Sequence, residues 1–192
     1  LTLRAGRAVE RDWLAGTLWP DSAPRDAFAS LRNSLLDLRH TLGPAAARLQ
    51  APNTRTLCLP LASEEADVLA FDGAVSRADT ASLEEAVALY RGPLLEGCVQ
   101  EWAFQERKVR EEAYLGALAR LAADAMARGE PEAAEQRLRL VTAVDPLREA
   151  AQRGLMAALA AGGNYAGALM VYRELRRLLH LSLIHISEPT RQ

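Results

Sequence analysis

A spacing of 34 residues recurs in the second half of the chain and constrains its fold more than any other sequence feature. Three pairs of matched residues share this spacing: Gly129 and Gly163, Ala134 and Ala168, and Leu138 and Tyr172. Glycine permits a sharp turn between two helices, and alanine lets neighbouring helices cross closely. The spacing therefore predicts a stack of successive helix pairs.

Helical periodicity fills the whole region around this repeat. From Glu64 onward, apolar residues recur every three or four positions, and they predict helices at 67–77, 82–90, 100–128, 131–144, 147–161 and 164–179. The period is typical of tetratricopeptide-like helix pairs, so residues 61–180 are predicted to form a helical repeat domain.

The first 60 residues predict a different domain that begins with two helices. Apolar residues one turn apart indicate a short helix at 10–19. A second helix is predicted at 24–43, because proline suits its first position and glycine its last. Asp21 and Ser22 precede this helix, and their side-chain oxygens are expected to cap it.

Two extended runs follow at 48–51 and 54–59, separated by a proline–asparagine pair that favours a turn, so we expect a β-hairpin. Helix, turn, helix and hairpin in this order indicate a winged helix-turn-helix. Residues 1–5 would end an earlier helix, and the N-terminal sheet of such a domain would be missing. The predicted fold is mainly α: a truncated winged helix-turn-helix at 1–60, then the repeat domain.

The final twelve residues, LSLIHISEPTRQ at 181–192, differ abruptly from the alanine-rich helices before them. The translation of a transposon-based sequencing adapter matches residues 181–191 letter for letter. We therefore expect this tail, with His185, to be an adapter artefact without function rather than a genuine short tail. Because Leu1 stands in place of methionine, we also expect the chain to be a fragment of a longer product.

Composition argues against several classes of protein. Cys58 and Cys98 lie far apart, which indicates neither a disulfide framework nor a zinc site and favours a reducing, cytoplasmic location. No apolar run approaches the ~20 residues that span a bilayer, so no membrane partner is expected. The histidines fit no Ser–His–Asp arrangement or metal cluster, and no glycine-rich phosphate loop occurs. We expect no enzyme activity, no cofactor and no metal.

Charge is unevenly distributed along the chain. The net charge of −2 argues by itself against a nucleic-acid partner. Residues 1–60 nevertheless contain eight arginines and five acidic residues, which gives a net charge of +3. The net charge of residues 61–180 is −5. The basic surplus therefore lies in the predicted helix-turn-helix domain, where a phosphate backbone would need it.

The predicted helix at 24–43 has an apolar stripe and a polar face. The stripe, which we expect to pack on the rest of the domain, consists of Leu31, Leu35, Leu38 and Leu42. In a major groove, asparagine pairs with adenine, arginine with guanine or phosphate, and an exposed leucine meets a thymine methyl. The candidate DNA contacts on this helix are Arg25, Arg32, Asn33, Leu36, Arg39 and His40, of which Arg25 would meet a phosphate near the helix N-terminus. A merely solvated face is the alternative.

The tip of the predicted hairpin offers another candidate contact. Arg55, with Thr54 and Thr56, could contact phosphate or the minor groove; a solvated turn is the alternative. Asp37 could orient an arginine, disfavour binding to non-target DNA sequences, or accept a hydrogen bond from cytosine. The three tryptophans are expected to pack in the core or between domains rather than stack on bases, because none lies in a basic stretch.

Three phrases carry a family resemblance: LWPDSAPRDAFASLRNSLLDLRHTLG at 18–43, SLEEAVALYRGPLLEG at 82–97 and DPLREAAQRGLMAALAAGGNYAGALMVYREL at 145–175. In their order and spacing they resemble transcriptional regulators of the Streptomyces antibiotic regulatory protein type, which join a winged helix-turn-helix to a bacterial transcriptional activator domain. The resemblance implies an activator that reads promoter repeats in double-stranded DNA and whose helical domain forms a homodimer or contacts RNA polymerase. The modest basic charge leaves open an interaction module of a signalling protein, in which the winged helix only scaffolds.

Overall fold

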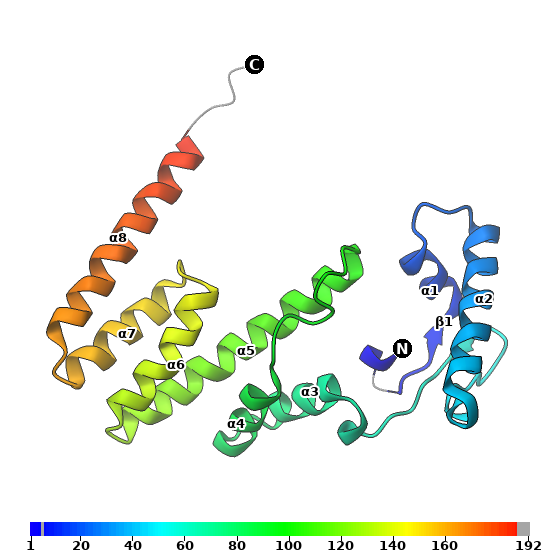
Figure 1. The fold of residues 1–192 in the computed structure, drawn as a ribbon, viewed down its shortest axis with the longest axis horizontal. Coiled ribbons are helices and arrows are strands. Elements are labelled where there is room, and N and C mark those ends of the chain that lie inside the picture. The colour runs from blue at the N-terminus through cyan, green and yellow to red at the C-terminus, as the bar shows by residue number, and fades with distance from the viewer. Residues whose placement is uncertain (5, 188–192) are drawn as a thin grey trace. The chain divides into compact units, whose positions relative to one another are not determined.

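The computed structural model describes residues 1–4 and 6–187, which form two compact units (Figure 1). The N-terminal unit contains Leu1–Gly73 together with Val99–Phe104. The C-terminal unit contains Ala74–Cys98 and the chain from Gln105 onward. Both units are built mainly from helices, as the sequence predicts.

The N-terminal unit packs two helices against a very small sheet. Its elements are η1 (Thr2–Arg4), β1 (Val9–Glu10), α1 (Arg11–Leu18), α2 (Pro24–Leu42), η2 (Gly43–Arg48), β2 (Thr56–Leu57) and η3 (Ser63–Glu65). β1 and β2 run antiparallel, with Val9 opposite Leu57. Gln50 and Cys58 form an antiparallel bridge through two N–H···O bonds of 2.9 Å. The sheet thus joins the start of α1 to the segment after η2.

The core of this unit lies between the helices and the sheet. Leu57 is fully buried and Ala15 is 2% exposed. The other buried members of the cluster are Val9, Leu14, Ala27, Leu31, Leu35 and Leu49. Arg48 and Glu65 form a bidentate ion pair in this unit. The two guanidinium nitrogens lie 2.6 and 2.7 Å from the two carboxylate oxygens.

The C-terminal unit is a series of helices in which neighbours along the chain pack together (Figure 1). The helices are α3 (Asp67–Arg77), which begins in the N-terminal unit, α4 (Thr80–Leu89), α5 (Glu101–Ala127), α6 (Pro131–Val144), α7 (Glu149–Ala161) and α8 (Tyr165–Ser187). Its main core draws leucine and alanine side chains from α5, α6 and α7. Among the helices of the described chain, none has the length and apolarity needed to cross a bilayer.

The repeated glycines make equivalent turns. Gly129 and Gly163 have φ angles of 75° and 79°, in the left-handed region that glycine adopts without strain. The residue after each glycine donates to a carbonyl five residues earlier, at 2.9 Å from Glu130 and 2.8 Å from Asn164. Each bond closes the end of a helix and starts the return helix. The pairing of helices predicted from the 34-residue spacing is therefore present at α5–α6 and α7–α8.

One arginine fixes the irregular segment between α4 and α5. The Arg107 guanidinium donates to the carbonyl oxygens of Leu94, Leu95 and Cys98 at 2.9, 2.7 and 3.1 Å. At the start of the same segment, the ring of Tyr90 stacks on that of Tyr114, with centroids 4.1 Å apart. These contacts tie the segment to α5, since both Arg107 and Tyr114 belong to that helix.

Several sequence predictions of local structure were wrong. The predicted β-hairpin is reduced to the Gln50–Cys58 bridge, because η2 extends to Arg48 and β2 pairs with β1 instead. Residues 2–4 form a 3-10 helix, and Ala5 lies outside the described residues. The last helix, predicted to end at residue 179, continues to Ser187, and residues 188–192 lie outside the described residues. The adapter origin of residues 181–192 stays a prediction.

Candidate nucleic-acid interface

α2 is positioned by one buried face and by favourable ends. Pro24 occupies its first turn, and Arg39 and His40 lie in its last turn. A cation such as the Arg39 guanidinium stabilises the helix there, because the C-terminal end of the helix dipole is negative. The residue before the helix is Ala23, which offers no side-chain cap, so the predicted capping by Asp21 and Ser22 is wrong. Gly43, at φ 54°, donates to two carbonyls of the last turn and ends the helix.

The apolar stripe of α2 anchors only its first two thirds. Leu31 and Leu35 are buried, at 4% and 5% exposed, as predicted. Leu38 is 37% exposed and Leu42 is half-buried, so their prediction as core anchors was wrong. The reason is length: α2 has 19 residues and spans about 28 Å, whereas α1, with 8 residues, spans about 12 Å. The C-terminal part of α2 therefore extends past the helix that covers it.

Three of the predicted arginines share one stripe of α2 with an exposed leucine. Arg25, Arg32, Leu36 and Arg39 follow each other at intervals of seven, four and three residues, so they line one side of the helix over about 21 Å. Leu36 is 57% exposed. Arg25 and Arg32 are exposed, whereas Arg39 is partly buried. We call these four residues the arginine stripe.

Asn33 and His40 lie beside the arginine stripe, seven residues apart and both exposed. The structure therefore brings six of the seven predicted contact residues onto one solvent-facing side of a single helix. Phe28, which the sequence analysis did not select, is 41% exposed and lies one turn before Arg32. Phe28 lies seven residues before Leu35, in line with the leucine stripe, so its spacing gave no signal of its exposure.

The seventh predicted residue, Arg55, lies in the turn before β2. The Asn53 Oδ1 atom accepts from the backbone N–H groups of Arg55 and Thr56 at 2.8 and 2.9 Å. The Arg55 carbonyl accepts from the backbone N–H of Arg11 at 2.8 Å. The Arg55 backbone is thus held on both sides while its side chain is exposed. Thr56 is only 8% exposed, so its predicted role as a DNA contact was wrong, whereas Thr54 is exposed.

These arginines have no charged partner among the residues that the structure describes. Among the described residues, Arg25, Arg32 and Arg39 form no ion pair, and neither does Arg55. In contrast, Arg48 of the same unit is paired with Glu65, and this bidentate hydrogen bond lowers the pKa of the Glu65 carboxyl. Asp37 is exposed and forms no ion pair with a described residue either. The free guanidinium groups suit an external polyanion.

The described residues offer no candidate metal site. No group of three or more His, Cys, Asp or Glu side chains within residues 1–4 and 6–187 is arranged to hold a metal ion. The arginine stripe is therefore the candidate site on which we base the functional proposal.

Comparison with known proteins gives three findings. Residues 59–189 match the family model of the bacterial transcriptional activator domain. Regulatory protein AfsR of Streptomyces coelicolor is 33% identical over 189 residues, which cover 93% of this chain and 19% of AfsR. The structure of Mycobacterium tuberculosis EmbR, solved in complex with a low-affinity phosphopeptide, is similar with a TM-score of 0.74 and 24% identity over 92% of this chain and 51% of that chain. The chain thus spans about a fifth of one relative and half of the other.

Proposed function

The chain belongs to the bacterial transcriptional activator domain family, and on that premise we propose that it is a cytoplasmic transcriptional regulator that binds promoter DNA through α2. The single observation that carries the proposal is the arginine stripe. Three arginines without an ion pair among the described residues, together with an exposed leucine, occupy one side of a helix whose other side is anchored in a core.

In this proposal, α1, α2 and the sheet act as a winged helix-turn-helix. α2 is the recognition helix, and the turn that carries Arg55 acts as the wing. Arg25 and Arg55 contact phosphates and set the register on the duplex. The central and C-terminal part of α2 reads base edges through Arg32, Asn33, Leu36, Arg39 and His40.

The C-terminal unit supplies protein contacts in this proposal. Its stacked helix pairs resemble tetratricopeptide-like repeats, whose extended surfaces bind proteins. We assign to it self-association, as a homodimer that would match repeated promoter sites, or contact with RNA polymerase. The chain acts by binding rather than by catalysis.

The proposal is tested by measuring DNA affinity against salt. The 192-residue protein is titrated with duplexes that it enriches from a random pool, at 50 to 200 mM salt. The logarithm of the affinity should fall with the logarithm of salt concentration by about 0.9 per phosphate contacted. Arg25→Ala and Arg55→Ala should each reduce that slope by about 0.9.

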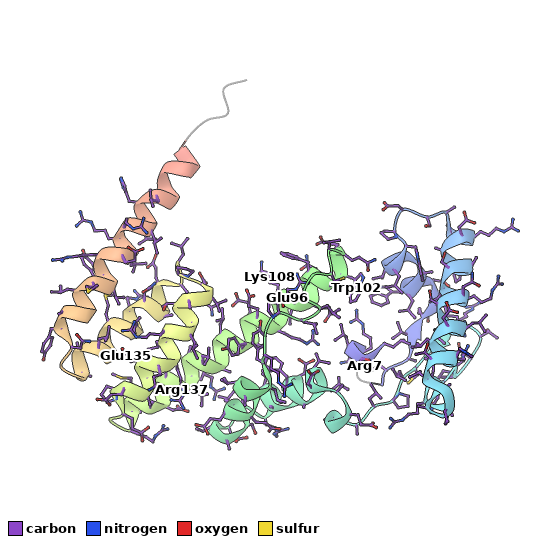
Figure 2. The ribbon with its side chains drawn as sticks, viewed as in Figure 1. Arg7, Glu96, Trp102, Lys108, Glu135 and Arg137 are labelled. Carbon is purple, nitrogen blue, oxygen red and sulfur yellow. The ribbon has the colours of Figure 1, made fainter. Side chains whose placement is uncertain are left out.

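Arg7→Ala is the matched control, because Arg7 is exposed in the same unit but lies outside α2 and the Arg55 turn (Figure 2). Its slope should equal that of the unaltered protein. Enrichment of no duplex, or a salt-independent affinity, contradicts the proposal and favours an interaction module in which the winged helix only scaffolds.

A further inference from the structure

All three tryptophans of the chain line one cleft of about 640 Å³ in the N-terminal unit. Trp13 belongs to α1, and Trp19 follows it in the turn before α2. Trp102 comes from the first turn of α5, in the Val99–Phe104 segment that belongs to this unit (Figure 2). A volume of this size falls in the range of small-molecule sites, about 300 to 1,000 Å³.

Contacts within the unit position two of the three indole rings. Trp19 packs against the core of the unit. The Trp102 Nε1 atom donates to the Gln100 Oε1 atom at 2.5 Å, which fixes the orientation of its ring. Trp13 is 45% exposed, so part of its ring is open to solvent. The cleft is therefore lined by tryptophan rings and is open to solvent.

The charged groups of the cleft all have the same sign. Asp21 and Glu101 contribute carboxylates to its lining, and the lining contains no arginine, lysine or histidine from the described part of the chain. The ring faces of tryptophan attract cations through their quadrupole. The structure already shows this attraction at the Trp13 ring, because the Arg4 guanidinium carbon lies 4.5 Å from its centroid. The Asp21 carboxylate and the indole faces together favour a positively charged occupant.

We propose that this cleft binds a small organic cation that carries a methylated or aromatic ammonium group. The cationic group lies against the indole faces, and Asp21 supplies a counter-charge at the turn before α2. This inference goes beyond DNA binding and does not depend on it, because Asp21 and the tryptophans are outside the arginine stripe.

Intrinsic fluorescence tests the proposal directly, because all of the protein's tryptophans line the cleft. Choline is the cationic probe, and 3,3-dimethylbutan-1-ol, which has the same shape without the charge, is the neutral comparison. Choline should change the emission saturably and bind the unaltered chain at least about threefold more tightly than the alcohol. No saturable change, or equal affinity for the two probes, overturns the proposal.

Variants of exposed carboxylates separate this site from general electrostatic attraction. Asp21→Asn should weaken choline binding about threefold or more and leave binding of the neutral alcohol unchanged. Asp12→Asn is the matched control, because Asp12 is exposed on α1 but does not line the cleft. Circular dichroism verifies that both variants keep the helical content. Equal weakening by the two substitutions contradicts a specific site.

Discussion

Arg39 differs from the other arginines of the arginine stripe because it is partly buried. Its planar guanidinium can make a bidentate contact, which a lysine cannot form although it keeps the charge. Asn33, on the adjacent side of α2, is exposed and can pair with adenine. These two residues therefore test whether α2 reads bases or only approaches phosphates.

We predict that Arg39→Lys and Asn33→Ala each cost ~1 to 3 kcal/mol of binding to the enriched duplex and relax its sequence preference. Affinity for unrelated duplexes should change little, because neither substitution removes a phosphate contact. Competition binding with specific and unrelated DNA measures both quantities. If both variants retain the affinity and the sequence preference of the unaltered protein, the assignment of base contacts is wrong.

A residue's side of α2 could be predicted from the sequence, but its burial could not. Helical spacing placed Asn33 opposite Leu31 and Leu35, with Arg32 on one flank, because a 3.6-residue period follows from local geometry. The exposure of Leu38 depends on where α1 ends, which is a tertiary property. The burial of Thr56 has the same origin, since the pairing of β2 with β1 decides which side chains face the core.

At the scale of elements, Asp79 is the N-cap of α4 and bonds the start of this helix with its side chain. Both carboxylate oxygens of Asp79 accept hydrogen bonds from Ser82, at 2.9 Å from its backbone N–H and 2.6 Å from its hydroxyl. Arg77 donates in turn to the Ser82 hydroxyl at 2.9 Å. The bonds from Ser82 lower the pKa of the Asp79 carboxyl.

We predict that Asp79→Ala lowers the thermal midpoint above pH 5 and that the difference shrinks at lower pH. A carboxyl whose pKa is lowered by folding contributes its stability above its unfolded pKa, about 3.9 for aspartate, and loses it as pH falls through the folded value. Thermal unfolding between pH 2 and 7 measures the difference. Asp12→Asn, an exchange of an exposed carboxylate on α1, serves as a comparison that leaves the α4 cap intact. A difference that does not vary with pH would contradict the linkage.

Two helix glycines form a matched pair. A Cβ added at Gly116 of α5 meets nothing within 4 Å, whereas one at Gly154 of α7 lies 3.3 Å from both terminal carbons of Leu138. We predict that Gly116→Ala stabilises the protein by about 0.5 to 1 kcal/mol, the usual gain of alanine over glycine in a helix. Gly154→Ala should gain less or destabilise, because Leu138 must shift within a packed core. Urea denaturation compares the two, and an equal gain would contradict the close packing of α6 on α7.

Element boundaries were predictable where the sequence contains explicit stop and start signals. The bounds of α3 and α6 match the predicted helices, and proline occupies the first turn of α6. β1 was missed because two residues are too few to show an alternating pattern. Periodicity predicted the last helix at 164–179, whereas α8 extends through Ser187.

At the scale of the whole molecule, the two units have separate hydrophobic cores. Leu57 is at 0% exposure in the N-terminal unit, and Val141 is at 0% exposure in the C-terminal unit. The sequence predicted a division near residue 60 from the change of pattern, but it could not predict that Val99–Phe104 joins the N-terminal unit. That assignment depends on which distant segments meet in space, and no local periodicity encodes it.

Separate cores lead to a prediction about cooperativity. Leu57→Ala should destabilise the N-terminal unit by about 2 to 5 kcal/mol, because it leaves a cavity in a buried site. Val141→Ala should act in the same sense on the C-terminal unit, to a smaller extent because it removes fewer atoms. Calorimetry should then show two unfolding transitions, of which each substitution lowers one. A single transition that both substitutions lower by comparable amounts would mean that the two cores unfold as one, and DNA binding through α2 would then depend on the stability of the helical repeats as well.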